Sequence, residues 1–389
     1  LKLFEFNKSN LNLKNSIKKK NYSNQNYIIS MTSGSTSDPK PLTYSQRTKI
    51  VRYKLFKKLY KIDNSDSIII TCPIATSLGM RMLFLPLLSG AKCVIMRKFT
   101  PKLYYNYVKK YDVTFSALVP SQIDDLINDK DEFKNFFLKK GLVSASSKLF
   151  DSTKKKIIKK KIKLFEMYGM AEMGTITSLK LSKKNNKPKN VGKVYDKKII
   201  VKILSENNKY LQKNKVGEII CKTPGRFVGY YSLSRLTKKA FFKGFFKTGD
   251  LGYLDKKNNL FYLGRKKNII KRSGINIYPE DIENILLKYN KIKEVALIPY
   301  VKNSTTRLVL FVKKENKLSY EIVRDVCLKK LSTFQLPDKI IMIKKFPKTA
   351  SQKIDKLKIK KKYHINLTIR PVTTLFSLTF IFFKQYFRN

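Results

Sequence analysis

The chain has 389 residues, and 83 lysine and arginine residues against 27 aspartate and glutamate residues give a formal net charge of +56. Its single histidine, His364, rules out a two-histidine metal site and is poorly placed for a Ser-His-Asp triad. The four cysteines form no CxxC pair, which argues against a zinc ribbon or a redox dithiol and predicts free thiols in a reducing cytoplasm. Any chemistry must rest on lysine, arginine, carboxylates, hydroxyls and backbone amides.

The positive charge has a compositional explanation. Only 12 of the 83 basic residues are arginine, Asn, Ile, Tyr and Phe are abundant, and Trp is absent, a profile typical of amino-acid drift in an AT-rich genome. Lysine runs at 154–156 and 159–161 are predicted to be solvated faces. A strong positive field attracts polyanions without specificity. We therefore expect no specific nucleic-acid partner, while peripheral contact with a membrane surface remains open.

The two ends of the chain carry few structural signals. The N-terminal segment is rich in lysine and asparagine and has no sustained apolar region of the kind found in a signal peptide. Residues 371–383 form an apolar run of 13 residues, whereas a membrane-spanning helix needs about 20. We interpret residues 363–389 as an appended tail and expect no transmembrane span.

In the first third of the chain, short β-branched runs alternate with longer stretches of helical spacing. The predicted strands are 27–32, 67–71, 91–96 and 113–119, and the predicted helices are 43–60, 78–89 and 101–111. Strands that alternate with helices of this length predict βαβ units and a mostly parallel sheet.

The pattern changes twice further along the chain. Short strands and frequent glycines over 217–263 predict an antiparallel subdomain with tight turns. Pro279 followed by two acidic residues is a helix-start signal. Strands at 295–300, 307–312 and 339–343 and a helix at 320–331 then complete a compact unit. The predicted fold is an α/β large domain with a β-rich subdomain (1–264), followed by a small, mobile α+β domain (265–362).

The first chemical motif is a Ser/Thr-rich loop. It reads Thr32-Ser33-Gly34-Ser35-Thr36-Ser37-Asp38-Pro39-Lys40 and is predicted to follow a strand and precede a helix. Its hydroxyls and amides can then converge on a phosphate, with the lysine adding charge. It is not a Walker A loop, because the residue immediately before the lysine is Pro39 and not glycine. Taken alone, such a segment is most often an ordinary loop.

Four further segments carry groups that could bind a nucleotide. Tyr168-Gly169-Met170-Ala171-Glu172 places a ring and a carboxylate at a strand end, where a ring could stack on a base and a carboxylate could hold Mg²⁺. Thr248-Gly249-Asp250 presents a carboxylate to ribose hydroxyls. Segment 264–283 is a longer basic stretch, and segment 346–356 is loop-like, so that Lys353 could swing into a site. Singly, each has an ordinary structural explanation.

In this order, the five segments resemble the core motifs of the AMP-forming adenylate enzymes, the superfamily of acyl-CoA synthetases, peptide-synthetase adenylation domains and firefly luciferase. The resemblance covers about residues 27–360. It implies that a small carboxylic acid is activated with ATP and Mg²⁺ as an acyl-adenylate and is then transferred to the thiol of CoA. The alternatives are transfer to the phosphopantetheine of an acyl carrier protein, and a catalytically decayed basic homologue.

The resemblance also implies a role for each matching residue. The phosphates of ATP would be bound by Ser33, Gly34, Ser35, Thr36 and Lys40, and Mg²⁺ by Thr32 and Glu172. Tyr168 would stack on adenine, with Gly169 allowing close approach of the backbone, and Asp250 and Arg265 would hold the ribose hydroxyls. Lys353 would be the catalytic lysine of adenylation, Lys267 the hinge of the small domain, and Gly274 a wall of the thiol tunnel.

Several positions depart from the family pattern. Ser37, Pro41 and Gln352 replace glycines, and the usual glycine-rich lining of the acyl pocket falls on the Ser/Ala-containing segment 142–147. Larger side chains there should narrow the acyl or adenine site, which favours a short or medium acid, aryl acids included, over a long-chain acid. The phosphate loop also begins at residue 32, whereas relatives usually carry more than a hundred residues before it.

Overall fold

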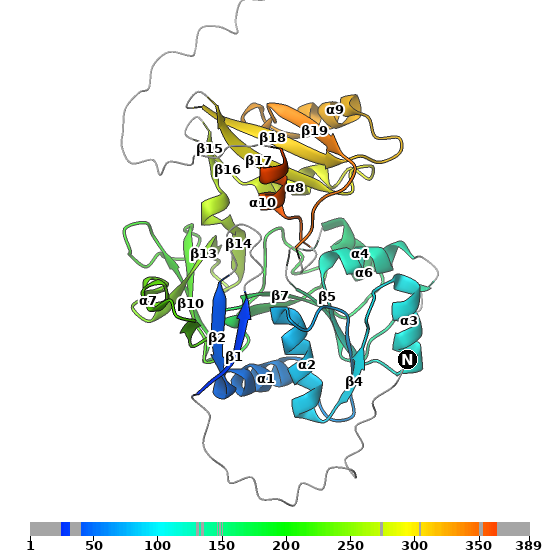
Figure 1. Ribbon diagram of the computed structural model, residues 1–389, viewed down its shortest axis with the longest axis vertical. Helices are drawn as coiled ribbons and strands as arrows, with labels where there is room; N and C mark the ends of the chain where they lie inside the picture. Colours follow the sequence, from blue (N-terminus) through cyan, green and yellow to red (C-terminus); the bar gives the residue numbers. More distant parts are fainter. Residues whose placement is uncertain are drawn as a thin grey trace, which may run out of the picture. The chain divides into compact units, whose positions relative to one another are not determined.

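The computed structural model describes residues 25–31, 40–129, 132–133, 136–145, 147, 149, 151–272, 275–302, 305–349 and 353–363. The chain forms two compact units (Figure 1). The first contains the residues up to Ile269 together with Phe346–Leu357, and the second contains Ile270–Lys345 and the residues from Lys358. The predicted small domain of 265–362 also included the Phe346–Leu357 segment, which here belongs with the first unit.

The first unit is built on a six-stranded sheet. Its order is β4 (Lys92–Ile95), β3 (Ser67–Ile70), β5 (Phe115–Leu118), β6 (Gly141–Ser144), β7 (Leu164–Met170) and β8 (Gly174–Lys180). All neighbours are parallel except β7 and β8, which form an antiparallel hairpin. The predicted mostly parallel sheet is therefore confirmed.

Helices cover both faces of this sheet (Figure 1). On one face pack α1 (Gln46–Tyr60) and α2 (Ser77–Ser89), and on the other α3 (Pro101–Lys110), α4 (Pro120–Asn128) and α6 (Asp151–Lys159). Successive strand residues point to opposite faces. In β3, Ile68 and Ile70 accordingly join the core under α1 and α2, while Ile69 joins the other core.

A separate three-stranded sheet corrects the prediction for the start of the chain. The predicted strand 27–32 forms β1 (Asn26–Met31), but it pairs antiparallel with β2 (Pro41–Ser45), which in turn pairs with β11 (Gly229–Tyr230). Residues 43–45 were predicted to be helical. They are extended, because the Ser45 side chain caps α1 by accepting from the Thr48 amide at 3.2 Å. In the sequence, the Ser/Thr-rich segment therefore lies between two strands, and the prediction that it directly precedes a helix was wrong, because β2 comes before α1.

The β-rich region is antiparallel, as predicted. Its five-stranded sheet consists of β9 (Ile200–Leu204), β10 (Gly217–Lys222), β12 (Phe241–Phe242), β13 (Phe245–Leu254) and β14 (Leu260–Arg265), with helix α7 (Ser234–Lys239) preceding β12. β13 lies between β10 and β14. In the register of β13 and β14, Asp250 stands opposite Arg265.

The second unit confirms the elements predicted for the C-terminal third. The hairpin β15 (Ile270–Arg272) and β16 (Ile275–Ile277) leads into α8 (Pro279–Leu286), which begins at the predicted proline. The remaining elements are β17 (Val295–Lys302), β18 (Thr305–Lys313), α9 (Tyr320–Lys330), β19 (Lys339–Ile343) and α10 (Lys356–Lys362). Of α10, the residues from Lys358 belong to the second unit. The strands pair in the order β17-β18-β19 around one apolar core.

One lysine of the predicted solvated runs is buried. The side chain of Lys154 on α6 is only 2% exposed, and its Nζ lies 2.5 Å from Oε2 of Glu166 on β7. The helix turns this position toward the sheet together with Thr153 and Ile157, so the prediction was wrong for Lys154. The other five lysines of the two runs are exposed.

Two further predictions concern cysteines and membrane segments. All four cysteines are free, as predicted. Among the described residues, no helix has the length and apolar character needed to cross a membrane. The apolar run 371–383 and His364 lie outside the described residues.

Candidate active site

A buried carboxylate joins three of the predicted motifs. The Tyr168 hydroxyl on β7 donates to Oδ2 of Asp250 at 2.7 Å, and Nε of Arg265 lies 2.8 Å from Oδ1 of the same side chain. Asp250 is 2% exposed and Tyr168 9%. Burial raises the pKa of Asp250, although Arg265 and Tyr168 act in the opposite direction. The structure therefore brings together residues that are 97 positions apart in the sequence, from 168 to 265.

The turn that carries Asp250 is fixed by local contacts. Thr248 donates its hydroxyl to the Ile219 carbonyl at 2.6 Å and accepts from the Asp250 amide at 3.0 Å. Gly249 has a φ of +71°, a conformation that favours glycine, and its amide donates to Oε1 of Glu218 at 3.1 Å. Across the ladder, Arg265 Nη1 donates to the Thr248 carbonyl at 2.8 Å. The carboxylate is held before any ligand arrives.

A second group of contacts gathers around Tyr230, a residue that the sequence did not single out. Its hydroxyl donates to Oε1 of Glu172 at 3.1 Å. The ammonium of Lys40 lies 5.4 Å from the centroid of its ring, within the range of a cation–π contact. Tyr230 therefore links the predicted phosphate lysine to the predicted metal ligand. The only sequence signal was its place in the glycine-rich β region.

The backbone of the Tyr168–Glu172 motif is clamped from α1. Arg52 donates through Nη2 to the carbonyls of Ala171 at 2.9 Å and Glu172 at 3.0 Å, and through Nε to the carbonyl of Gly225 at 2.7 Å. Sequence reasoning missed this arginine, because nothing separates it from the other basic residues of a lysine-rich helix.

Packing within the β7–β8 hairpin requires a glycine at position 169. A Cβ at this position would lie 2.2 Å from the carbonyl oxygen of Gly174 on the neighbouring strand β8. The hairpin itself therefore excludes any side chain. Close approach of adenine to this glycine stays a prediction.

The other predicted residues are distributed along the chain. Lys353 is half-buried, and its backbone contacts Thr349. The Thr349 amide donates to the Lys353 carbonyl at 2.8 Å, and the Lys353 amide donates to Thr349 Oγ1 at 3.2 Å. Lys267 lies two residues before the division between the units, and partial burial, Arg265 and Lys40 lower its pKa. Six predicted residues lie outside the described ones: Thr32, Ser33, Gly34, Ser35, Thr36 and Gly274.

Two family models match the sequence of this chain. Residues 3–231 match the family model for the AMP-binding enzymes, and residues 281–353 match the model for the C-terminal domain of AMP-binding enzymes. The chain belongs to the AMP-binding enzyme family, which confirms the resemblance to the AMP-forming adenylate enzymes.

Its curated relatives include CoA ligases. The oxalate–CoA ligase of Saccharomyces cerevisiae is 30% identical over 340 residues, which is 85% of this chain and 62% of the relative. The 2-succinylbenzoate–CoA ligase of Listeria innocua is 36% identical over 148 residues, which is 38% of this chain and 32% of the relative. This chain thus spans less than two thirds of the length of these two relatives.

Solved structures confirm the fold class. ATP-bound MatB from Rhodopseudomonas palustris superposes with a TM-score of 0.77 at 23% identity, covering 86% of this chain and 67% of that one. The O-succinylbenzoate coenzyme A synthetase of Bacillus subtilis, in complex with ATP and a magnesium ion, gives 0.77 at 22% identity, covering 85% and 69%.

Proposed function

We propose that this chain activates a small carboxylic acid with ATP as an acyl-adenylate and transfers the acyl group to the thiol of CoA. One observation carries the proposal: a single buried carboxylate, Asp250, is shared by Tyr168 and Arg265. A carboxylate offers about four lone-pair sites, of which these neighbours use two. The remaining sites can accept the two hydroxyls of a ribose, with the Tyr168 ring on the adenine side.

Glu172 and Lys40 are suited to the phosphates. Mg²⁺ is usually held by one or two carboxylates together with substrate phosphates. The described residues contain no cluster of three or more metal-ligating His, Cys, Asp or Glu side chains, and a single carboxylate such as Glu172, with Thr32, fits a metal that arrives with ATP. Ser33, Gly34, Ser35, Thr36 and Lys40 would then surround the phosphates.

The chemistry needs cations and not a general base. The attacking carboxylate is already ionised at neutral pH. It approaches an anionic α-phosphate, so positive charge must stabilise the transition state. Lys353 would supply that charge in the first step. Rotation of the small domain at Lys267 would then replace Lys353 by the face carrying Gly274, where the thiol attacks the mixed anhydride and AMP leaves.

The acceptor thiol is proposed to be that of CoA, since the relatives described above are CoA ligases. A carrier-protein phosphopantetheine is the second candidate, because a net charge of +56 complements an acidic carrier protein. Adding CoA and phosphopantetheinylated carrier protein in competition would show which thiol receives the acyl group. The free cysteines agree with a cytoplasmic setting.

The direct test is pyrophosphate release from ATP and Mg²⁺ with a panel of carboxylic acids, with and without CoA. Acid-dependent release establishes adenylation, and thioester formation establishes the second step. No release with any acid, from folded protein that also fails to bind ATP, would show that the chain is an inactive homologue.

Changing Tyr230 to Phe tests how Glu172 is positioned. The change removes the hydrogen bond to Glu172 but keeps the ring beneath Lys40. We expect the KM for MgATP to rise about 10-fold, the value of one hydrogen bond to a charged group. Pyrophosphate release at varied MgATP measures it. The matched control is Tyr231→Phe, at a neighbouring tyrosine that is 50% exposed; equal effects of the two changes would contradict the assignment.

A further inference from the structure

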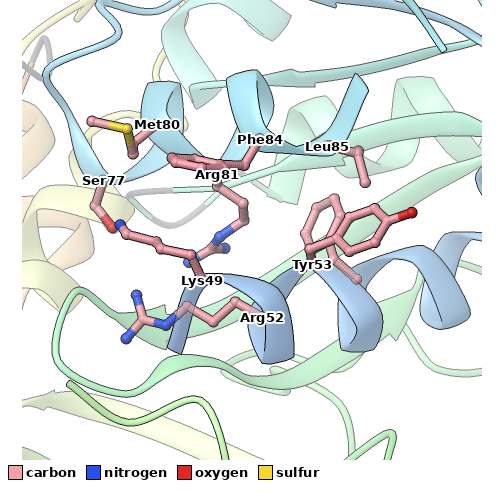
Figure 2. A pocket seen from close by; sticks show the side chains of 9 residues that line it. Lys49, Arg52, Tyr53, Ser77, Met80, Arg81, Phe84 and Leu85 are labelled. Atoms are coloured by element: carbon pink, nitrogen blue, oxygen red, sulfur yellow. The ribbon is translucent and has the colours of Figure 1, made fainter. Parts of the chain in front are cut away.

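A small pocket between α1 and α2 is lined by three cations. Lys49 and Arg52 come from α1 and Arg81 from α2, and the rest of the wall is mostly aromatic and apolar, with the Ser77 hydroxyl beside it (Figure 2). The volume of this pocket is about 20 Å³. That space suits one small polar group rather than a whole acid.

No carboxylate of the described residues lies within ion-pair distance of these three cations. Arg52 donates to backbone carbonyls, and Arg81 Nη1 donates to Thr175 Oγ1 at 2.9 Å. Burial, followed by the charge of Arg52, lowers the pKa of Arg81 to about 10. The described residues therefore hold no ion pair for these three cations, although the charge of Glu172 acts on Arg52 from beyond ion-pair distance.

Lys49 is the least satisfied of the three. Its side chain is buried, with 9% of the residue exposed, and within the described part of the chain its ammonium has no hydrogen-bond acceptor. The ammonium lies 3.9 Å from the centroid of the Tyr44 ring. Burial, Arg52 and Arg81 lower its pKa to about 7. Figure 2 shows Lys49 reaching across the pocket toward Ser77, in the first turn of α2, where the helix dipole adds positive potential.

The pocket adjoins the hairpin that carries the Tyr168–Glu172 motif. Arg81 contacts Met167 on β7 and Thr175 on β8, at 3.0 and 2.9 Å. Arg52 holds the carbonyls of Ala171 and Glu172. An anion in the pocket would therefore sit behind the same strands that present the predicted nucleotide-binding groups.

We propose that Lys49, Arg52 and Arg81 bind the second carboxylate of a dicarboxylic acid, so that the substrates of this chain are short dicarboxylates. A carboxylate supplies the missing acceptor for the ammonium and balances the cluster. The aromatic and aliphatic wall then excludes water from the ion pair. This inference rests on the proposed function, because it assigns the far end of the acid that is activated.

The test compares acids that differ only by one carboxylate: acetate with malonate, propionate with succinate, and butyrate with glutarate. Acid-dependent pyrophosphate release gives kcat/KM for each. The intact chain should prefer the dicarboxylate of at least one pair by about 10- to 100-fold, the range expected for hydrogen bonds to a charged group. In Lys49→Met the preference should disappear while monocarboxylate turnover is kept. Lys54→Met, on the exposed side of α1, should leave the preference unchanged.

Thermal unfolding provides a second readout that does not need turnover. Malonate, succinate or glutarate should raise the Tm of the intact chain more than the matched monocarboxylate, and Lys49→Met should abolish the difference. Without any acid, Lys49→Met should have the higher Tm, because it removes a buried cation from between two guanidinium groups.

The outcomes separate the two proposals. Turnover of monocarboxylates and dicarboxylates alike, or a preference that persists in Lys49→Met, overturns the dicarboxylate site and leaves the adenylation proposal standing. If no acid is turned over, the adenylation proposal fails. The unfolding experiment then decides alone: equal Tm shifts with both members of every pair overturn the site.

Discussion

Changing Lys353 to Ala is expected to reduce acid-dependent pyrophosphate release by at least about 100-fold, the usual cost of removing one preorganised group that stabilises transition-state charge. The loss should fall on kcat rather than on the KM for ATP, since the proposed contact forms as the carboxylate attacks the α-phosphorus. The two hydrogen bonds between Thr349 and Lys353 use the backbone amide and carbonyl of Lys353, which alanine keeps, so the variant should fold. Steady-state pyrophosphate release measures the effect.

Two controls distinguish chemistry from structure. Transfer of acyl from a supplied acyl-adenylate to CoA should survive in Lys353→Ala, because the proposed second step does not use this lysine. Lys361→Ala, at an exposed lysine of α10, should behave like the unchanged chain. Equal loss of both half-reactions in Lys353→Ala would instead assign the lysine a structural role.

The largest expected stability effect is at the buried ion pair. Glu166→Leu would leave the Lys154 ammonium, on a side chain that is 2% exposed, without the carboxylate now 2.5 Å away. Breaking a buried pair on one side costs about 3–5 kcal/mol. Urea unfolding of the variant should show this loss in the free energy of unfolding.

The double variant Lys154→Met with Glu166→Leu tests the cause. Replacing both partners by apolar residues is often neutral or stabilising, so it should recover most of the lost stability. Lys155→Met, at the exposed neighbour, should change the free energy of unfolding little. A destabilised double variant would mean that packing around Glu166, and not the unpaired ammonium, causes the loss.

Most secondary structure could be predicted, because its signals are local. The β-branched run of β3, the proline at the start of α8 and the apolar run of β18 are each readable within a few residues. Strand β1 was predicted as a strand, but its pairing was not, and residues 43–45 of β2 were predicted to be helical. An isolated apolar run does not specify its partner, and pairing with β11, some 190 residues away, is a tertiary event.

By itself, the sequence determined the family and the order of its motifs, because residue types and their spacing can be recognised without knowledge of tertiary contacts. Only the tertiary structure decided what those residues contact. Asp250 meets Tyr168 because β7 and β13 come together, Tyr230 joins Lys40 to Glu172, and Lys154 is buried while its neighbours are exposed. The cations of the pocket could not be predicted either, because the sequence does not distinguish a buried lysine from a solvent-exposed one. Burial and charge balance are properties of side chains gathered from distant segments, and they exist only once the chain has folded.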